Sequence, residues 1–232
     1  MSDKAPRLSK RLLAIRDMIP DCDLFTDIGT DHGYLPIELI LSGRCKKAVA
    51  ADIRKGPLDS ARANAKEYGI DGERISFILS AGLQDTDAPE QGYNVLCIAG
   101  MGGLNIAGIL KDDKDKARSY DVLYLSPQSK QEELRRFLVS NGYRIDDERY
   151  LVDEGKLYVI MKVIRGVSKE YTEGEFLLGA FAGKAAEDIS VREAFIQKHG
   201  ELKKLLETGG LPGDRRKIII NQEKIYREVL KL

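Results

Sequence analysis

The sequence predicts an α/β fold built on a largely parallel sheet and followed by a helical segment. Between residues 24 and about 165, short apolar runs alternate with amphipathic stretches, a spacing that implies right-handed βαβ crossovers. From about residue 173 onward the pattern is helical, with no strand signal. The length of 232 residues fits one large domain, or one medium domain with a small appendage.

The predicted strands of the first part are short apolar runs, and the predicted helices lie between them. Pro36 suits the first turn of the helix that follows the first strand. The last two strands are joined by Asp153-Glu154-Gly155, which is typical of a hairpin turn. The strands are predicted at 24–28, 47–52, 74–79, 93–99, 120–125, 143–152 and 156–164, and the helices at 33–42, 57–68, 102–111 and 130–140.

An α/β domain that closes with an antiparallel hairpin is unusual for dinucleotide-binding folds and usual for class I methyltransferase folds. We therefore predict a Rossmann-like class I methyltransferase domain with a mostly parallel seven-stranded sheet over residues 1–165, including a basic helical segment at 1–20. Residues 166–232 are predicted to form a second domain, a coiled-coil-like helical hairpin. Its helices are expected at 173–208 and 214–231, on either side of a Gly/Pro-rich breaker.

The predicted helical hairpin is close to electrically neutral. Residues 167–232 carry 12 basic and 11 acidic residues, so this segment is not a strongly basic arm. Covering hydrophobic surface, mediating dimerisation and holding RNA all remain open as its role.

The overall composition excludes few function classes, but it bears on the binding partners, membrane association and cellular compartment to expect. Acidic and basic residues balance at 37 each, so net charge predicts neither a nucleic-acid nor a membrane partner. No apolar stretch is long enough to span a bilayer, and the N-terminus lacks the apolar core of a signal peptide. The three cysteines show no metal-ligand spacing; we expect no metal site and a reducing, cytoplasmic setting.

Local charge is uneven at the N-terminus. Residues 1–16 carry five basic residues against Asp3, and Arg7, Lys10 and Arg11 share one helical face. Two interpretations are open. The segment either contacts nucleic-acid phosphates or forms a solvated amphipathic helix that caps the sheet.

The run at residues 24–28 leads into an acid- and glycine-rich turn, the most informative motif of the chain. Gly29 and Gly33 permit close approach of the backbone to a ligand. Asp27 and Asp31 favour a cationic ligand with hydroxyl or amino groups, such as S-adenosyl-L-methionine, and one of them is predicted to receive its ammonium group. The spacing of the glycines fails the dinucleotide and P-loop patterns. A plain turn is the alternative.

Asp52 closes the second predicted strand, where an acid is placed to accept hydrogen bonds from both ribose hydroxyls. Helix capping is the alternative, but the next helix is predicted to begin only near Pro57. Ile53 is expected to pack on the adenine face. Gly82 and Leu83, after the third strand, are expected to contact the adenine edge, although such a turn is also common without a ligand.

Two further loops complete the predicted site. After the fourth strand, Ala99, Gly100 and Met101 are predicted cofactor contacts, with core filling as the alternative for Met101. Gly102 and Gly103 are predicted to leave room for a flat substrate group. In the loop after the fifth strand, the amide of Gln128 beside Pro127 suits a base edge, and a simple turn is the alternative. His32 is either a base-contacting group or a plain polar loop residue.

Together these motifs resemble those of the bacterial tRNA adenine-22 N1-methyltransferases, class I enzymes with a helical C-terminal domain. The resemblance rests on residues 8–12, 27–36, 98–103 and 178–179. The chain departs from the family pattern at residues 126–128, where Ser-Pro-Gln replaces Gln-Pro-Asn, and has Asp52 where some members have Glu.

The resemblance implies methyl transfer from S-adenosyl-L-methionine to N1 of an adenine in the D-arm region of tRNA. Asp31 is then the candidate for stabilising the charge that develops on the base, with His32 second. Arg7, Lys10 and Arg11 become candidate phosphate contacts. We expect a monomer or weak dimer. The alternatives are a methyltransferase for another RNA or a small molecule, and a non-catalytic RNA-binding protein that retains the fold.

Overall fold

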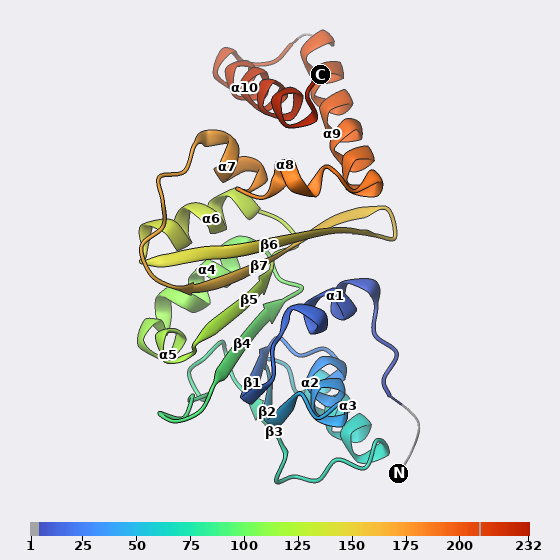
Figure 1. Ribbon diagram of the computed structural model, residues 1–232, viewed down its shortest axis with the longest axis vertical. Helices are drawn as coiled ribbons and strands as arrows, with labels where there is room; N and C mark the ends of the chain where they lie inside the picture. The colour runs from blue at the N-terminus through green and yellow to red at the C-terminus, as the bar shows by residue number, and fades with distance from the viewer. Residues whose placement is uncertain (1–4, 209) are drawn as a thin grey trace.

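A seven-stranded sheet forms the centre of the computed structural model, which describes residues 5–208 and 210–232 (Figure 1). The strand order is β3-β2-β1-β4-β5-β7-β6; β1 to β5 run parallel, and β7 runs antiparallel to both of its neighbours. The predicted mostly parallel seven-stranded sheet is therefore confirmed. The strands are β1 (Cys22–Ile28), β2 (Cys45–Asp52), β3 (Ile75–Leu79), β4 (Asn94–Ala99), β5 (Val122–Ser126), β6 (Tyr143–Asp153) and β7 (Lys156–Arg165).

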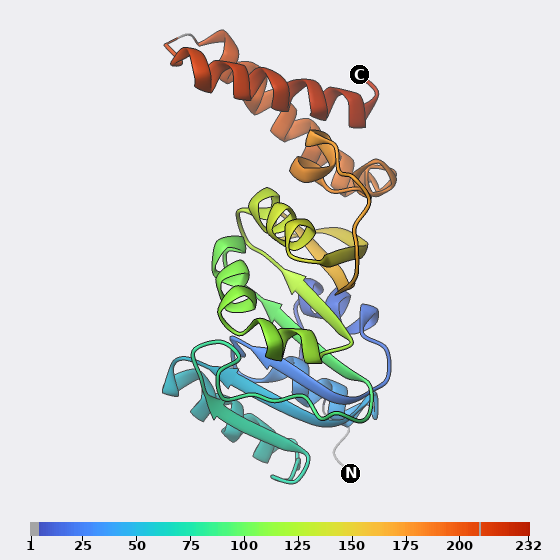
Figure 2. The same cartoon turned by 90° about the vertical axis from the view of Figure 1, so that its left-hand side faces the viewer.

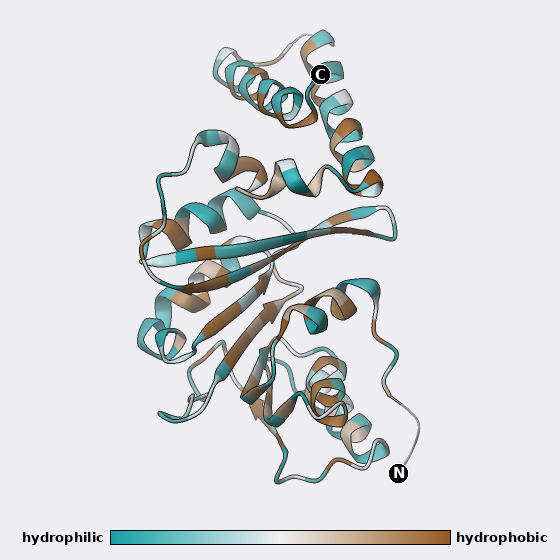
Figure 3. Ribbon diagram, in the orientation of Figure 1, coloured by the Kyte–Doolittle hydropathy of each residue, from teal (hydrophilic) through white to brown (hydrophobic). Residues whose placement is uncertain are grey.

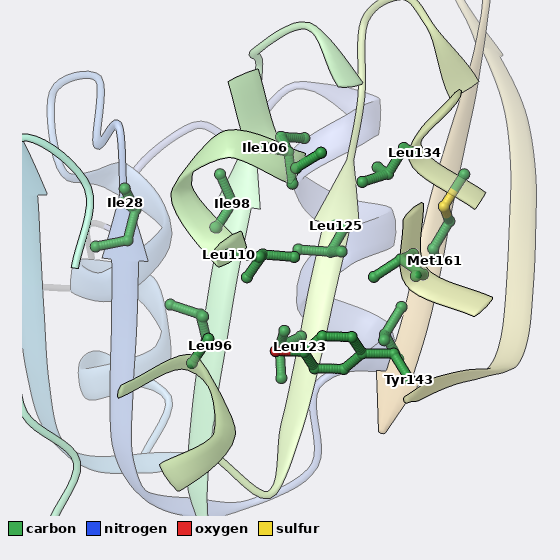
Figure 4. Packing of buried hydrophobic residues seen from close by; sticks show 14 of the residues in the cluster. Ile28, Leu96, Ile98, Ile106, Leu110, Leu123, Leu125, Leu134, Tyr143 and Met161 are labelled. Carbon is green, nitrogen blue, oxygen red and sulfur yellow. The ribbon is translucent and has the colours of Figure 1, made fainter. Parts of the chain in front are cut away.

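Helices cover both faces of this sheet. Figure 3 shows that β1, β4 and β5 are strongly hydrophobic, as expected for strands buried on both sides. On one face Ile98 and Leu123 pack against Ile106, within the largest buried cluster (Figure 4). On the other, Ile15 and Leu35 cover the same strands. The first face carries α4 (Gly103–Asp112), α5 (Lys114–Ser119) and α6 (Gln131–Ser140), and the second α1 (Lys10–Met18), α2 (Tyr34–Leu41) and α3 (Lys55–Glu67).

The basic N-terminal segment contains α1, which packs on the sheet beside the β6–β7 hairpin. The Ser9 hydroxyl accepts a hydrogen bond from the Leu12 amide and caps the helix. The backbone N–H of Arg11 lies 3.4 Å from Asp153 Oδ2 at the hairpin turn. The helix therefore begins at a position fixed by β6. The first four residues of the predicted segment lie outside the described range.

The C-terminal part differs from the prediction of one helix over 173–208. Three helices occupy this stretch: α7 (Glu173–Leu178), α8 (Ala182–Ala185) and α9 (Ile189–Glu207). Gly179 ends α7 with a φ of +95°, and Asp188 starts α9 by accepting hydrogen bonds from Ser190 N and Val191 N. The helical pattern of the sequence is continuous across these breaks because all three helices bury side chains in the same cluster.

The final helix, α10 (Gly213–Leu230), packs against α9, so the predicted helical hairpin is present in the fold. Phe195 and Tyr226 meet edge to face, with ring centroids 5.8 Å apart. Figure 2 shows this hairpin projecting beyond the end of the sheet. Within the part of the chain that the structure describes, no helix combines the length and apolarity needed to cross a bilayer.

Candidate active site

The strand order reverses between β1 and β4, and open α/β sheets bind ligands outside the carboxyl ends of their strands at such a point. A cavity of about 380 Å³ lies at this place, a size within the usual range for small-molecule sites. Loops after β1, β2, β4 and β5 contribute to its wall, together with α1. The lining residues are Arg11, Leu12, Asp27, Gly29, Asp31, His32, Tyr34, Leu35, Asp52, Ile53, Arg54, Ala99, Gly100, Met101 and Gln128.

Asp27 stands near the end of β1 as a buried carboxylic acid with 8 % exposure. Burial raises the pKa of Asp27 to about 6, and the nearby Arg11 guanidinium opposes this rise. A carboxylate held so far from water gains strongly from a cationic partner. Asp27, the predicted candidate for the ammonium group, thus lines the cavity as a buried acid.

Asp52 ends β2 and is also buried. Its Oδ1 accepts a hydrogen bond from the Arg54 amide at 2.8 Å, which orders the turn into α3. Helix α3 begins at Lys55, earlier than predicted, yet its N-cap is Arg54 and not Asp52. A carboxylate offers about four acceptor positions, so Asp52 retains capacity for the two hydroxyls of a ribose.

Two glycines with positive φ line the cavity, one after β1 and one after β4. Gly29 has a φ of +77° and leaves the space that the Met101 side chain fills. Gly100, with a φ of +82°, faces Arg11 Nη1 and Gln128 Nε2, each 3.7 Å from the point where a Cβ would lie. Met101 also packs against the main core cluster, so cavity lining and core filling both apply to it.

The structure corrects the role expected of Gly102 and Gly103. Neither lines the cavity: a Cβ on Gly103 would overlap the Lys130 carbonyl, and one on Gly102 would lie 3.3 Å from Ser129 Oγ. The Gly103 amide donates to the Ser129 carbonyl at 2.7 Å. These glycines allow the loops after β4 and β5 to pack backbone against backbone, which holds Gly100 and Gln128 in place.

Replacing Gly103 by alanine is expected to lower the free energy of unfolding by about 1–3 kcal/mol, because the added methyl group meets backbone that cannot move aside. Gly108, in the same helix, has no atom within 4 Å of the corresponding position. Gly108→Ala should therefore raise stability by about 0.5–1 kcal/mol. Urea denaturation of both variants measures the contrast, and equal effects would contradict this account.

Four other residues predicted from the loop motifs do not line the cavity. Gly33 faces Ala61 of α3, and Pro127 is buried beside Gln128. Gly82 faces Ile109, and Leu83 is fully buried in the main core cluster, where its amide donates to Asp113 Oδ2. The side chain of Leu83 therefore belongs to the core, and a contact of the loop at residues 82–83 with the adenine edge stays a prediction.

The rim of the cavity carries the polar and aromatic groups. Asp31 is 75 % exposed in its side chain, and its Oδ1 lies 3.4 Å from His32 Nε2. The His32 ring stacks on that of Tyr34 with centroids 5.5 Å apart and an interplanar angle of 19°. Sequence reasoning missed Tyr34, although its place as the first residue of α2 was a usable signal. It also missed Leu12, Leu35 and Arg54.

The three basic residues predicted to act together are separated. Arg7 and Lys10 are exposed, whereas the side chain of Arg11 is half-buried and lines the cavity. Helix periodicity places them on one face, but that face spans the boundary between solvent and the site.

Comparison with known proteins agrees with the fold. Residues 8–161 match a family model described as a methyltransferase domain. The chain is 31% identical over 192 residues to the tRNA (adenine(22)-N(1))-methyltransferase of Bacillus subtilis, which covers 81% of this chain and 79% of that protein. A candidate tRNA (m1A22) methyltransferase of Streptococcus pneumoniae, solved in complex with S-adenosyl-L-methionine, superposes with a TM-score of 0.86 at 31% identity, covering 97% of this chain and all of that one. TrmK of M. capricolum, in complex with S-adenosyl-homocysteine, gives a TM-score of 0.84 at 25% identity, with 97% and 98% covered.

Proposed function

This chain belongs to the family of tRNA (adenine(22)-N(1))-methyltransferases, and on that premise we propose that it transfers a methyl group from S-adenosyl-L-methionine to N1 of adenine 22, in the D-arm region of tRNA. The observation that carries the proposal is the cavity at the sheet's reversal point. The buried acids of β1 and β2 line it together with Gly100.

The residues present fit such a donor. Asp27 offers a buried acceptor for an ammonium group, and Asp52 has free acceptor capacity for ribose hydroxyls. Ile53 is 69 % exposed on the cavity wall, so it presents an apolar surface for the adenine ring. When bound, the donor supplies an electrophilic methyl group on a positively charged sulfur. The protein's part is to hold that group in line with the incoming nitrogen.

On the acceptor side, N1 of adenine is a neutral nucleophile and needs no base before it attacks. The product carries a positive charge, which a nearby carboxylate stabilises. We assign this role to Asp31 on the rim. The stacked rings of His32 and Tyr34 are assigned as the surface on which the extruded base stacks. Gln128 also lines the cavity, with an amide suited to the base edge.

Asp31→Asn is expected to lower kcat roughly 10- to 100-fold, less than a buried group would, because the exposed carboxylate is screened by water. Affinity for S-adenosyl-homocysteine should change little. Asp59→Asn is the matched control, since Asp59 is a comparably exposed acid on α3 paired with Arg62. A large loss of cofactor affinity would instead assign Asp31 to the donor, and an unchanged kcat would remove it from the chemistry.

Mass-spectrometric nucleoside analysis tests the function directly. Unmodified tRNA incubated with the protein and S-adenosyl-L-methionine should yield 1-methyladenosine, and tRNA with guanine in place of adenine 22 should not. Failure to label any tRNA, with intact cofactor binding, would favour a small-molecule substrate. That alternative also predicts activity that varies little between about 50 and 200 mM salt, because no phosphate contacts are involved.

The proposal extends to organisation and setting. We assign residues 1–165 to the methyl-transfer domain and 166–232 to a helical domain attached to it. We propose that the protein acts on tRNA in the cytoplasm as a monomer or weak dimer, with Arg7 and Lys10 as exposed phosphate contacts.

A further inference from the structure

Arg11 places its guanidinium in the cavity instead of on the surface. Nη1 and Nη2 lie 3.7 and 3.8 Å from the point where a Cβ on Gly100 would be. The guanidinium carbon is 5.5 Å from the centroid of the Tyr158 ring, on β7. Helix α1 and this ring therefore fix a cation beside the open face of the glycine loop.

One end of this guanidinium lacks a hydrogen-bond partner among the residues that the structure describes. Nη1 of Arg11 is buried and makes no hydrogen bond with any part of the chain that the structure describes. Leaving a buried charged donor unsatisfied is costly, and such groups in a binding cavity are commonly satisfied by a ligand. The Arg11 guanidinium lies close enough to Asp27, the acid in the same cavity, to oppose the rise that burial causes in the pKa of Asp27.

The pair of Arg11 and Asp27 presents one cation and one buried acid in a single cavity. An α-amino-acid head group has the complementary arrangement, with a carboxylate and an ammonium on one carbon atom. The other parts of the proposed donor, its adenine, ribose and sulfonium, carry no anion. Charge complementarity therefore matches the guanidinium to the carboxylate, and Arg–carboxylate pairs form strong, oriented hydrogen bonds.

We propose that Arg11 binds the α-carboxylate of the methionine part of S-adenosyl-L-methionine, while Asp27 accepts its ammonium group. This inference rests on the proposed function and deepens it, because it names the residue that selects a zwitterionic donor. It also removes Arg11 from the predicted set of tRNA phosphate contacts and leaves that role to the exposed Arg7 and Lys10.

Calorimetry on the full chain with two ligands tests the assignment. The first ligand is S-adenosyl-homocysteine; the second is its decarboxylated analogue, which keeps the ammonium group and lacks only the carboxylate. Arg11→Gln should weaken the first roughly 10- to 100-fold, the effect of losing a charged hydrogen-bonded contact, and the second less than about threefold. Lys66→Gln, at an exposed lysine on α3, should change neither.

Two results would overturn the assignment. Equal weakening of both ligands would mean that Arg11 acts through Asp27 or through the fold, and unchanged affinity for S-adenosyl-homocysteine would mean that it does not contact the cofactor. Should Arg11→Gln not fold, Arg11→Lys gives the same ligand contrast, because an ammonium cannot reproduce a forked contact. A wild-type protein that binds neither ligand contradicts the proposed function as well, whereas intact binding with no contrast contradicts only the role of Arg11.

Discussion

Replacing Arg135 by methionine is expected to lower the free energy of unfolding by about 3–5 kcal/mol, because it leaves Glu148 as an unpaired buried charge. The two side chains are 2 % and 0 % exposed, and Arg135 Nε donates to Glu148 Oε1 at 2.7 Å. Urea denaturation followed by circular dichroism measures the loss.

The same guanidinium ties the C-terminal helices to the sheet. Its Nη1 donates to the carbonyls of Phe176 and Leu177 at 3.1 Å each, at the end of α7. Burial raises the pKa of Tyr150 well above its usual value, so its hydroxyl stays protonated beside Glu148 and the Leu178 carbonyl. The methionine variant should therefore also expose the chain near α7 to limited proteolysis.

Arg136 provides the control, since it is the next residue along α6 but is 38 % exposed and pairs with Glu132 and Glu173 on the surface. Arg136→Met should cost no more than about 1 kcal/mol. Arg135→Lys keeps the charge but not the forked contacts, so an intermediate loss is expected. Similar small losses for both methionine variants would contradict a structural role for the buried pair.

Much of the fold was predictable from sequence because burial on both faces makes strands β1, β4 and β5 continuous apolar runs. The structure has an extra helix, α5, which buries only Ala117 and so leaves no periodic signal. The division of the tail at Gly179 was missed for a different reason. A Cβ there would overlap Tyr150 and Glu148, a constraint set by residues distant in sequence.

Some residues of the candidate site were likewise predictable from the sequence, and others were not. Acids that end neighbouring parallel strands come together by topology alone, so Asp27 and Asp52 could be placed in one site from the sequence. Arg11 could not be placed in this site from the sequence, because the direction of its side chain depends on how α1 packs beside β7. Gly103 carried the same sequence signal as Gly100, and only the position of the Lys130 backbone distinguishes a packing glycine from a cavity glycine.

Asp27→Asn is expected to stabilise the protein while it weakens cofactor binding. The pKa of Asp27 is about 6 in the folded chain, above the value of about 3.9 usual for an unfolded aspartate. Between these values the folded protein binds more protons than the unfolded one, so Asp27 removes stability as the pH rises through this window. Asparagine lacks this penalty, and the gain at pH 7.5 should be about 1–3 kcal/mol, shrinking toward pH 4.

Whereas Asp27→Asn should raise stability, it should lower the affinity for the cofactor. An amide in place of the carboxylate loses a charged acceptor for the ammonium group, which should weaken S-adenosyl-homocysteine binding roughly 10- to 100-fold at pH 7.5. In the wild type the same affinity should fall as the pH drops below about 6, because protonated Asp27 must ionise before it accepts the ammonium group. Urea denaturation and calorimetry at several pH values measure both effects.

Asp23 is the matched control on the same strand. It is more exposed, and Lys46 lowers its pKa, so Asp23→Asn should not gain stability at neutral pH and should leave cofactor affinity unchanged. Loss of stability in Asp27→Asn at pH 7.5 would mean that the carboxylate is satisfied within the folded protein. A gain in stability combined with weaker binding would instead show that β1 holds an unfavourable acid because the cofactor's cation compensates it on binding.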